Sequence, residues 1–199
     1  GRGACGPHKS GARSEKPGSL ARGGVRHAGF YSFNPFRRIV REQSHMTAIQ
    51  DQLRHNHCFG CGADNDKGLQ IKSHWHGDEC ICHYMPRPEQ CAGPLQYVYG
   101  GTIASIVDCH SINTAMSNYY KVEGREIGQG PEIWCVTGRL TVNYFAPTPI
   151  DQEIVLRASI DECGERKTRV KCRVFSGDVQ TAEGDVIAVR VAEDWKDPG

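Results

Sequence analysis

The chain has 199 residues, of which 38% are hydrophobic and 24% are charged. This length suits one domain with an appended segment and is enough to bury a core. No apolar run approaches the roughly 18 residues that are typical of a membrane-spanning helix, so we expect no membrane span and no membrane partner. The composition favours a soluble, cytoplasmic protein.

The formal net charge of +1 conceals an asymmetry along the chain. Residues 1–45 contain nine Lys or Arg and two Asp or Glu, so this segment carries about +7 and the remainder about −6. An acidic body without a helix-turn-helix, zinc-finger or RNA-recognition pattern is a poor match for nucleic acid. We therefore expect no nucleic-acid partner.

Residues 1–45 are rich in Gly, Arg and Ser and show no apolar period. Such a segment cannot pack by itself, which predicts a basic arm that is disordered or loosely docked. One alternative is an organellar leader, although its glycines would weaken the amphipathic helix that a leader needs. Another is a segment foreign to the natural protein, which would then open at Met46. The folded domain is expected to span residues 46–199.

The first half of this domain alternates turn formers with short periodic segments. A short helix is expected over 47–54, and a turn-rich stretch follows over 58–69. Alternating apolar residues then predict two strands, over 70–76 and 79–84, joined by a tight turn at Gly77.

Three prolines, Pro86, Pro88 and Pro94, enforce a loop before a long helix that begins at Gly100 and ends near Tyr120. Four further strands follow, at hairpin spacing, over 133–145, 153–161, 167–175 and 185–192. The helix is apolar on nearly every side, which indicates that protein surrounds it. We therefore predict an α+β fold in which an antiparallel sheet of about six strands wraps around one long central helix.

Asp108 stands two turns inside this apolar helix, just beyond the glycine pair Gly100-Gly101 at its start. An unpaired carboxylate is costly to bury, and such groups gather at functional sites. Free backbone N–H groups at a helix start favour negative charge, and glycine lets a substrate approach them without a Cβ in the way. These features indicate a functional site at the start of this helix.

Three motifs in this order resemble the PaaI-type acyl-CoA thioesterases of the hotdog fold, over about residues 55–192. They are the leader Cys-Phe-Gly-Cys-Gly followed by Asn-x-x-Gly-Leu, the Gly-Gly pair with an Asp seven positions on, and the strand Val-Thr-Gly-Arg-Leu-Thr-Val-Asn-Tyr-Phe-Ala-Pro. The resemblance implies a homodimer or homotetramer with active sites between subunits. It also implies hydrolysis of a small or medium acyl-CoA to free acid and coenzyme A, with no cofactor and no metal.

Carried over position by position, the resemblance gives each site residue a role. Gly100 would stabilise the oxyanion, and Gly101 would line the same turn. Asp108 would act as general base on water or as nucleophile, two alternatives that stay open. Thr137, from the neighbouring subunit, would orient the water.

The chain departs from the family pattern at Tyr99, where the usual motif is His-Gly-Gly. Tyrosine keeps a hydrogen-bonding group but does not carry charge near neutral pH. Gln96 is the nearby candidate for the amide residue that often precedes the motif. The departure leaves an alternative function open, namely a hotdog protein that binds acyl-CoA or an acyl carrier with weak or no hydrolysis.

Cysteine and basic residues offer two further hypotheses. Cys58 and Cys61 have the spacing of a zinc knuckle, but no second close pair accompanies them, so we expect no metal and reduced thiols. An acidic body needs a local basic patch for coenzyme A phosphates. Arg166, Lys167 and Arg169 are the best candidates, with Arg139 as a second choice, although a solvated hairpin tip fits the same residues.

Overall fold

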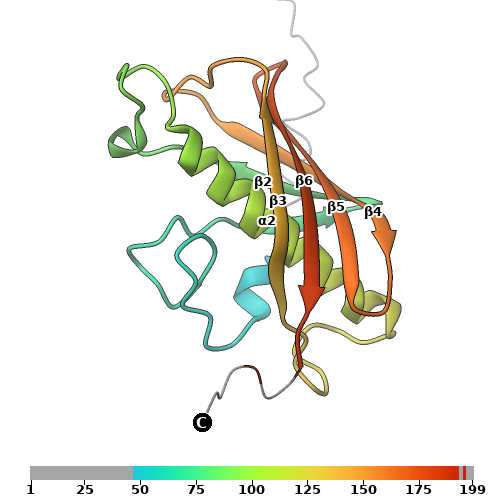
Figure 1. Cartoon of the computed structure of the whole chain (residues 1–199). Coiled ribbons are helices and arrows are strands. Elements are labelled where there is room, and N and C mark those ends of the chain that lie inside the picture. Colours follow the sequence, from blue (N-terminus) through green and yellow to red (C-terminus); the bar gives the residue numbers. More distant parts are fainter. Residues whose placement is uncertain (1–46, 193–194, 196–199) are drawn as a thin grey trace, which may run out of the picture.

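The computed structural model describes residues 47–192 and residue 195, and it shows one antiparallel sheet with one long helix against it (Figure 1). The elements, in chain order, are η1 (Ile49–Gln52), β1 (Ser73–His76), β2 (Glu79–Tyr84), η2 (Pro88–Gln90), α2 (Gly100–Val122), β3 (Cys135–Tyr144), β4 (Ile154–Cys163), β5 (Lys167–Ser176) and β6 (Val179–Arg190). The predicted α+β hotdog fold, six strands and one central helix, is confirmed. None of the helices in this described part is long and apolar enough to cross a membrane.

Two segments differ from the expectation. The last strand begins at Val179 rather than near 185, because it forms a tight hairpin with β5 and pairs along its whole length. The predicted helix at 47–54 is a short 3-10 turn, and a second such turn, η2, lies in the proline-rich loop. The basic arm predicted for residues 1–45 lies outside the described residues.

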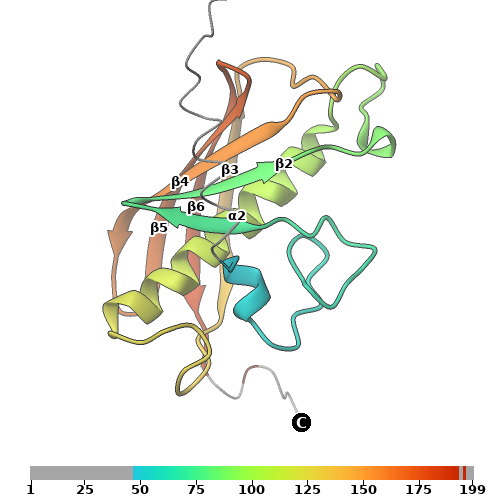
Figure 2. The ribbon, with the colours of Figure 1, turned by 180° about the vertical axis from the view of Figure 1, so that it is seen from behind.

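The strand order is β1-β2-β4-β5-β6-β3, so β3 forms an edge of the sheet although it comes third in the chain. After α2 the chain runs to the far edge, and β3 then pairs with β6 alone. β4, β5 and β6 form an antiparallel meander. Seen from behind, α2 lies across the concave face of the sheet (Figure 2).

The core lies between α2 and this face of the sheet. Ile106 and Val107 are fully buried, and they face alternate residues of the central strands such as Val170 and Val186. The helix comes closest at Gly184, where an added Cβ would lie 2.3 Å from Val107 Cγ1. Glycine is therefore required in β6 at this point for the sheet to close on the helix.

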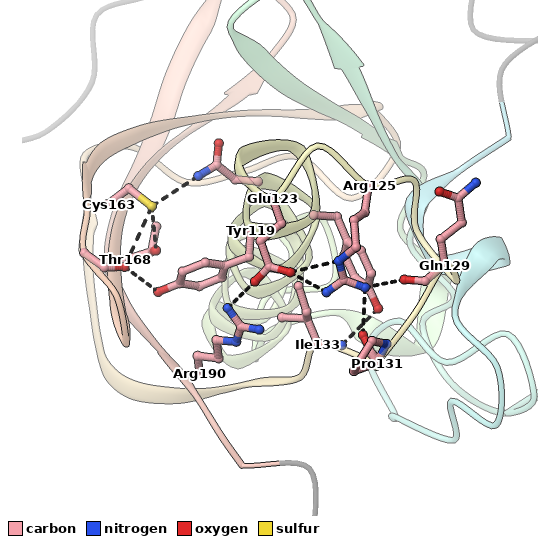
Figure 3. A network of polar contacts seen from close by, with 12 residues as sticks. Tyr119, Glu123, Arg125, Gln129, Pro131, Ile133, Cys163, Thr168 and Arg190 are labelled. Atoms are coloured by element: carbon pink, nitrogen blue, oxygen red, sulfur yellow. Dashed lines mark hydrogen bonds and ion pairs between the residues drawn. The ribbon is translucent and has the colours of Figure 1, made fainter.

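Ion pairs fasten the C-terminal end of α2 to the sheet (Figure 3). The Glu123 carboxylate forms ion pairs with Arg190 of β6 at 2.6 Å and with Arg125 of the following loop at 2.5 Å. The Tyr119 hydroxyl donates to the Gly164 carbonyl in the β4–β5 turn at 3.1 Å. These contacts fix the C-terminal end of the helix.

Candidate active site

The N–H groups of Gly100 and Gly101, at the start of α2, are two candidate backbone donors. The N–H groups of Thr102 and Ile103 both donate to the Tyr99 carbonyl, at 3.0 and 3.3 Å. Among the hydrogen bonds between described residues, none uses the N–H group of Gly100 or Gly101. Helix-start amides without a partner can donate to a developing negative charge.

Two tyrosines surround this helix start. The Tyr144 hydroxyl, at the end of β3, donates to the Gly100 carbonyl at 2.7 Å. The Tyr99 ring covers Gly101 so closely that an added Cβ there would lie 2.2 Å from Cε1 of the ring. At Gly100 the nearest atom to such a Cβ would be 3.6 Å away, which is ordinary contact. Gly101 therefore makes room for the Tyr99 ring.

Asp108 lies half-buried in the middle of α2, and Thr137 Oγ1 donates to its Oδ1 at 2.6 Å. Desolvation raises the pKa of this carboxyl, and the Thr137 hydrogen bond opposes that shift. The expectation that Thr137 reaches Asp108 from a neighbouring subunit needs correction, because the bond forms within one chain. The bond forms within one chain because the chain path brings β3 back beside α2.

A β-bulge positions Thr137. Thr137 pairs with Ala188 of β6 while Arg139 pairs with the very next residue, Ile187, so Gly138 is the extra residue. A Cβ at Gly138 would lie 2.7 Å from Val189 Cγ2, so glycine suits this position. Bulges re-aim side chains next to functional sites, and here the bulge directly follows the hydroxyl that holds Asp108.

Helix geometry separates Asp108 from the glycine pair of its own chain. At a rise of about 1.5 Å per residue, the eight positions between Gly100 and Asp108 span about 12 Å along the axis. One thioester carbonyl cannot contact both groups of a single helix. A site that uses both needs the Asp108 of one protomer to face the helix start of another.

Sequence reasoning missed Gln90, which lies beside the helix start. Its carbonyl accepts from the Tyr99 N–H at 2.8 Å, and its side-chain Oε1 accepts from the Tyr84 hydroxyl and the Arg87 N–H. The buried Nε2 has no partner among the described residues. Gln96, the residue chosen from the sequence, is exposed. The only signal favouring Gln90 was its place in a proline-fixed turn, which does not reveal the direction of a side chain.

The predicted phosphate-binding residues are only partly available. Arg169 is held by Asp185, with Nη2 and Oδ2 2.5 Å apart, and Lys171 binds the same carboxylate at 2.7 Å. Arg166, in the β4–β5 turn, and Lys167, the first residue of β5, remain exposed. This turn lies at the C-terminal end of α2, where Tyr119 contacts Gly164, so it is remote from the Gly100 end of its own chain.

One group of side chains near Asp108 could hold a metal. The Sγ atoms of Cys58, Cys61 and Cys109 all lie within 4.8 Å of one another. Cys109 directly follows Asp108 in α2. The sequence alone did not place it with the other two.

Comparisons with known proteins agree with the fold and with the motifs. Residues 95–183 match the family described as the thioesterase superfamily. A thioesterase superfamily protein from Shewanella loihica PV-4 is 32% identical, with a TM-score of 0.53 over 69% of this chain and 96% of its own.

Two more distant structures are similar in fold alone. The E. coli PaaI protein from the phenylacetic acid degradation operon is 14% identical, with a TM-score of 0.50 over 62% of this chain and 82% of its own. A thioesterase from Haemophilus influenzae is 9% identical, with a TM-score of 0.52 over 63% and 80%. The comparison with curated proteins found no match.

Proposed function

The chain belongs to the thioesterase superfamily, and from that premise we propose that it is a PaaI-type enzyme that hydrolyses a small or medium acyl-CoA to free acid and coenzyme A. One observation carries this proposal: a half-buried carboxylate, Asp108, is held by a hydroxyl at 2.6 Å in a chain whose helix-start amides bind no described residue. Acyl transfer from a thioester needs a base or nucleophile and donors for the oxyanion. The chain supplies both.

In the proposed reaction, the thioester carbonyl accepts hydrogen bonds from the Gly100 and Gly101 N–H groups of one protomer. Asp108 of the other protomer takes a proton from water as the water oxygen attacks the carbonyl carbon. The tetrahedral oxyanion then collapses, the C–S bond breaks, and the departing thiolate takes the proton from Asp108, which becomes a carboxylate again. In the alternative route Asp108 itself attacks the carbonyl carbon and the C–S bond breaks to release the coenzyme A thiolate; water then hydrolyses the mixed anhydride to the free acid and Asp108.

A dimer is part of the proposal because the two halves of the site lie about 12 Å apart along one helix. Among the described strands, β3 pairs on one side only, and two exposed aromatic residues lie at its end: Tyr144 is 51% and Phe145 59% exposed. Tyr99, next to the glycine pair, is 59% exposed. An open strand edge with exposed aromatic residues at its end is a surface that a second chain can cover.

The deciding experiment measures free thiol released from short, medium, long and aromatic acyl-CoAs, with the native chain and with Asp108→Asn. We expect release with at least one acyl group and a loss of about 10²- to 10⁴-fold in the variant. Tight binding of acyl-CoA without thiol release above buffer would overturn the hydrolase proposal and establish the binding protein instead.

The second candidate, an acyl-CoA or acyl-carrier binding protein, is favoured by one observation. Tyr99 stands in the family's histidine position with its ring folded over Gly101. The variant Tyr99→His separates the two functions: a large gain in turnover indicates that the native chain binds its ligand more than it hydrolyses it. Unchanged or reduced turnover indicates that Tyr99 suits hydrolysis.

A further inference from the structure

The turn that contains Cys58 and Cys61 packs directly on α2 beside Cys109. Cys58 Sγ and Cys109 Sγ are 3.6 Å apart, and Cys61 Sγ lies within 4.8 Å of both. Gly60 allows this contact, because a Cβ there would lie 2.2 Å from Cys109 Sγ. Three thiols from two elements therefore converge on one point.

N–H donors surround these sulfur atoms. Asn113 Nδ2, one turn after Cys109, donates to Cys61 Sγ at 3.2 Å, and Asn56 Nδ2 approaches the same sulfur at 3.8 Å. Asn56 Oδ1 also accepts from the Cys58 N–H at 3.1 Å, which fixes the start of the turn. Donors aimed at sulfur stabilise thiolates, the form in which cysteine binds a metal.

The Cys58 thiol receives such donors as well. The thiols of Cys109 and Cys61 and the backbone N–H groups of Cys61 and Gly60 all approach Cys58 Sγ. The two-residue spacing of Cys58 and Cys61 is also the spacing of paired cysteine ligands in structural zinc sites.

The distance between Cys58 Sγ and Cys109 Sγ matches a tetrahedral zinc site, and Cys61 Sγ lies within 4.8 Å of both. With Zn–S bonds of about 2.3 Å, tetrahedral geometry places two sulfurs about 3.8 Å apart, close to the observed 3.6 Å. We infer that Cys58, Cys61 and Cys109 bind one Zn²⁺ as three thiolates, with a fourth position open to water on the exposed side of Cys58. Binding releases the thiol protons to solvent and involves no redox step.

Zinc is favoured over other partners by the donor set. Three sulfurs without a carboxylate in the group select a soft or borderline ion, and Zn²⁺ tolerates tetrahedral sites without redox change. A disulfide would use only two of the three sulfurs and would leave the Asn113 donor facing the third. The sequence argued against a metal for want of a second pair of ligands, and Cys109, 51 positions after Cys58, supplies the missing convergence.

The inference is independent of hydrolysis, since its readout is metal content and spectrum. The full chain, prepared in reductant without chelator, is expected to hold about one zinc per chain by mass spectrometry. Replacement by Co²⁺ should give the intense visible bands and sulfur-to-metal charge transfer of a tetrahedral thiolate site. Cys58→Ser, at an exposed position, should weaken binding by at least about 100-fold without unfolding the chain.

Matched variants separate a site from adventitious thiol binding. Cys163→Ser, at another exposed cysteine near the far end of α2, should leave zinc content and the cobalt spectrum unchanged. Asn113→Ala should weaken binding by about 10-fold while every ligand remains. The inference is wrong if reduced chain takes up Co²⁺ without thiolate bands, if Cys163→Ser and Cys58→Ser lose metal equally, or if mass spectrometry of chain kept in reductant finds a disulfide within the trio.

Discussion

Thr137 Oγ1 donates a 2.6 Å hydrogen bond to Asp108 Oδ1, which ties the edge strand β3 to the middle of α2 within one chain. The bond passes from an exposed residue to a half-buried one. A protomer that packs on β3 and moves Thr137 would therefore change the hydrogen bond to the candidate catalytic carboxylate. The first predictions concern these two residues.

Asp108→Asn should abolish most hydrolysis without destabilising the fold. Burial raises the pKa of Asp108, so the ionised carboxylate is unfavourable where it lies, and a neutral amide of equal size removes that cost. We expect the melting temperature to stay the same or rise at neutral pH while turnover falls about 10²- to 10⁴-fold. A large fall in melting temperature would instead identify Asp108 as a structural residue.

Thr137→Val keeps the shape of the side chain and removes the donor to Asp108. A hydrogen bond to a charged group contributes about 1.5–3 kcal/mol, which corresponds to about 10- to 100-fold in rate if it acts in the transition state. Thr137→Ser retains the hydroxyl and should keep most of the activity. Equal loss in both variants would contradict a role for the hydroxyl. Steady-state kinetics with the preferred acyl-CoA provides the measurement.

The two glycines at the start of α2 should respond differently to alanine. In Gly101→Ala the new Cβ meets the Tyr99 ring at 2.2 Å and must displace it, whereas in Gly100→Ala the nearest atom is 3.6 Å away. We expect about 10- to 100-fold loss of turnover for Gly101→Ala, because small misplacements at the reacting centre are costly. The loss for Gly100→Ala should be several-fold smaller.

Two controls support the glycine comparison. Gly93→Ala, in the preceding loop, introduces a Cβ with no atom within 4 Å and should behave as the native chain. Adding Tyr99→Ala to Gly101→Ala removes the clash, so the double variant should lose less activity than the two single losses predict. Additive losses would show that the ring and the glycine act independently.

Phe145→Lys should dissociate the proposed dimer. Phe145 is 59% exposed just beyond the edge strand, where a buried charge would be unpaired in an interface. Light scattering after gel filtration should change from the mass of a dimer to that of the 22.0 kDa chain, with loss of activity. Val122→Lys, at a similarly exposed residue near the C-terminal end of α2, is the matched control and should remain dimeric. A native chain that is already monomeric and active would refute the two-subunit site.

Asp185 should stabilise the chain in a pH-dependent way. Hydrogen bonds from Arg169, followed by those from Lys171, lower the pKa of its carboxyl below the unfolded value. Because the folded-state pKa is depressed, this stability is present above the unfolded pKa and is lost as the pH falls through the folded one. Asp185→Asn should therefore cost about 1 kcal/mol at pH 7 and nothing in strong acid. Denaturant titration across pH provides the check, with Asp178→Asn, in an exposed turn, as control; a loss that persists in acid would contradict this origin.

The fold was accessible to sequence reasoning because its signals are local and mutually consistent. The all-round apolar character of α2 and the spacing of the glycines around β4, β5 and β6 each follow from side-chain period. Three motifs in one order then led to the hotdog fold and to the thioesterase superfamily, both of which the comparisons confirm. The start of β6 was missed because Val179 lies in a hairpin whose turn is too tight to leave a gap in the pattern.

The site was harder, because it depends on which elements meet. Asp108 and the glycine pair became candidates from their places in an apolar helix and at its start, and their roles stay predictions. Thr137 binds Asp108 of its own chain because β3 returns to lie beside α2. That return depends on the strand order of the sheet, which no local sequence pattern encodes. The contact between Cys109 and Cys58 also depends on which elements meet. So does the ion pair between Arg169 of β5 and Asp185 of the neighbouring strand β6.

The strand order has a consequence for synthesis. β3 leaves the ribosome before β4 and β5, yet its partner in the sheet is β6, the final element, so the nascent chain carries an unpaired strand until nearly the whole domain has emerged. Over the same interval α2 lacks the cover that β6 gives to Val107. Folding of this chain is therefore a late, long-range event, and a protein truncated before Val179 would expose an apolar helix together with an open edge to neighbouring chains.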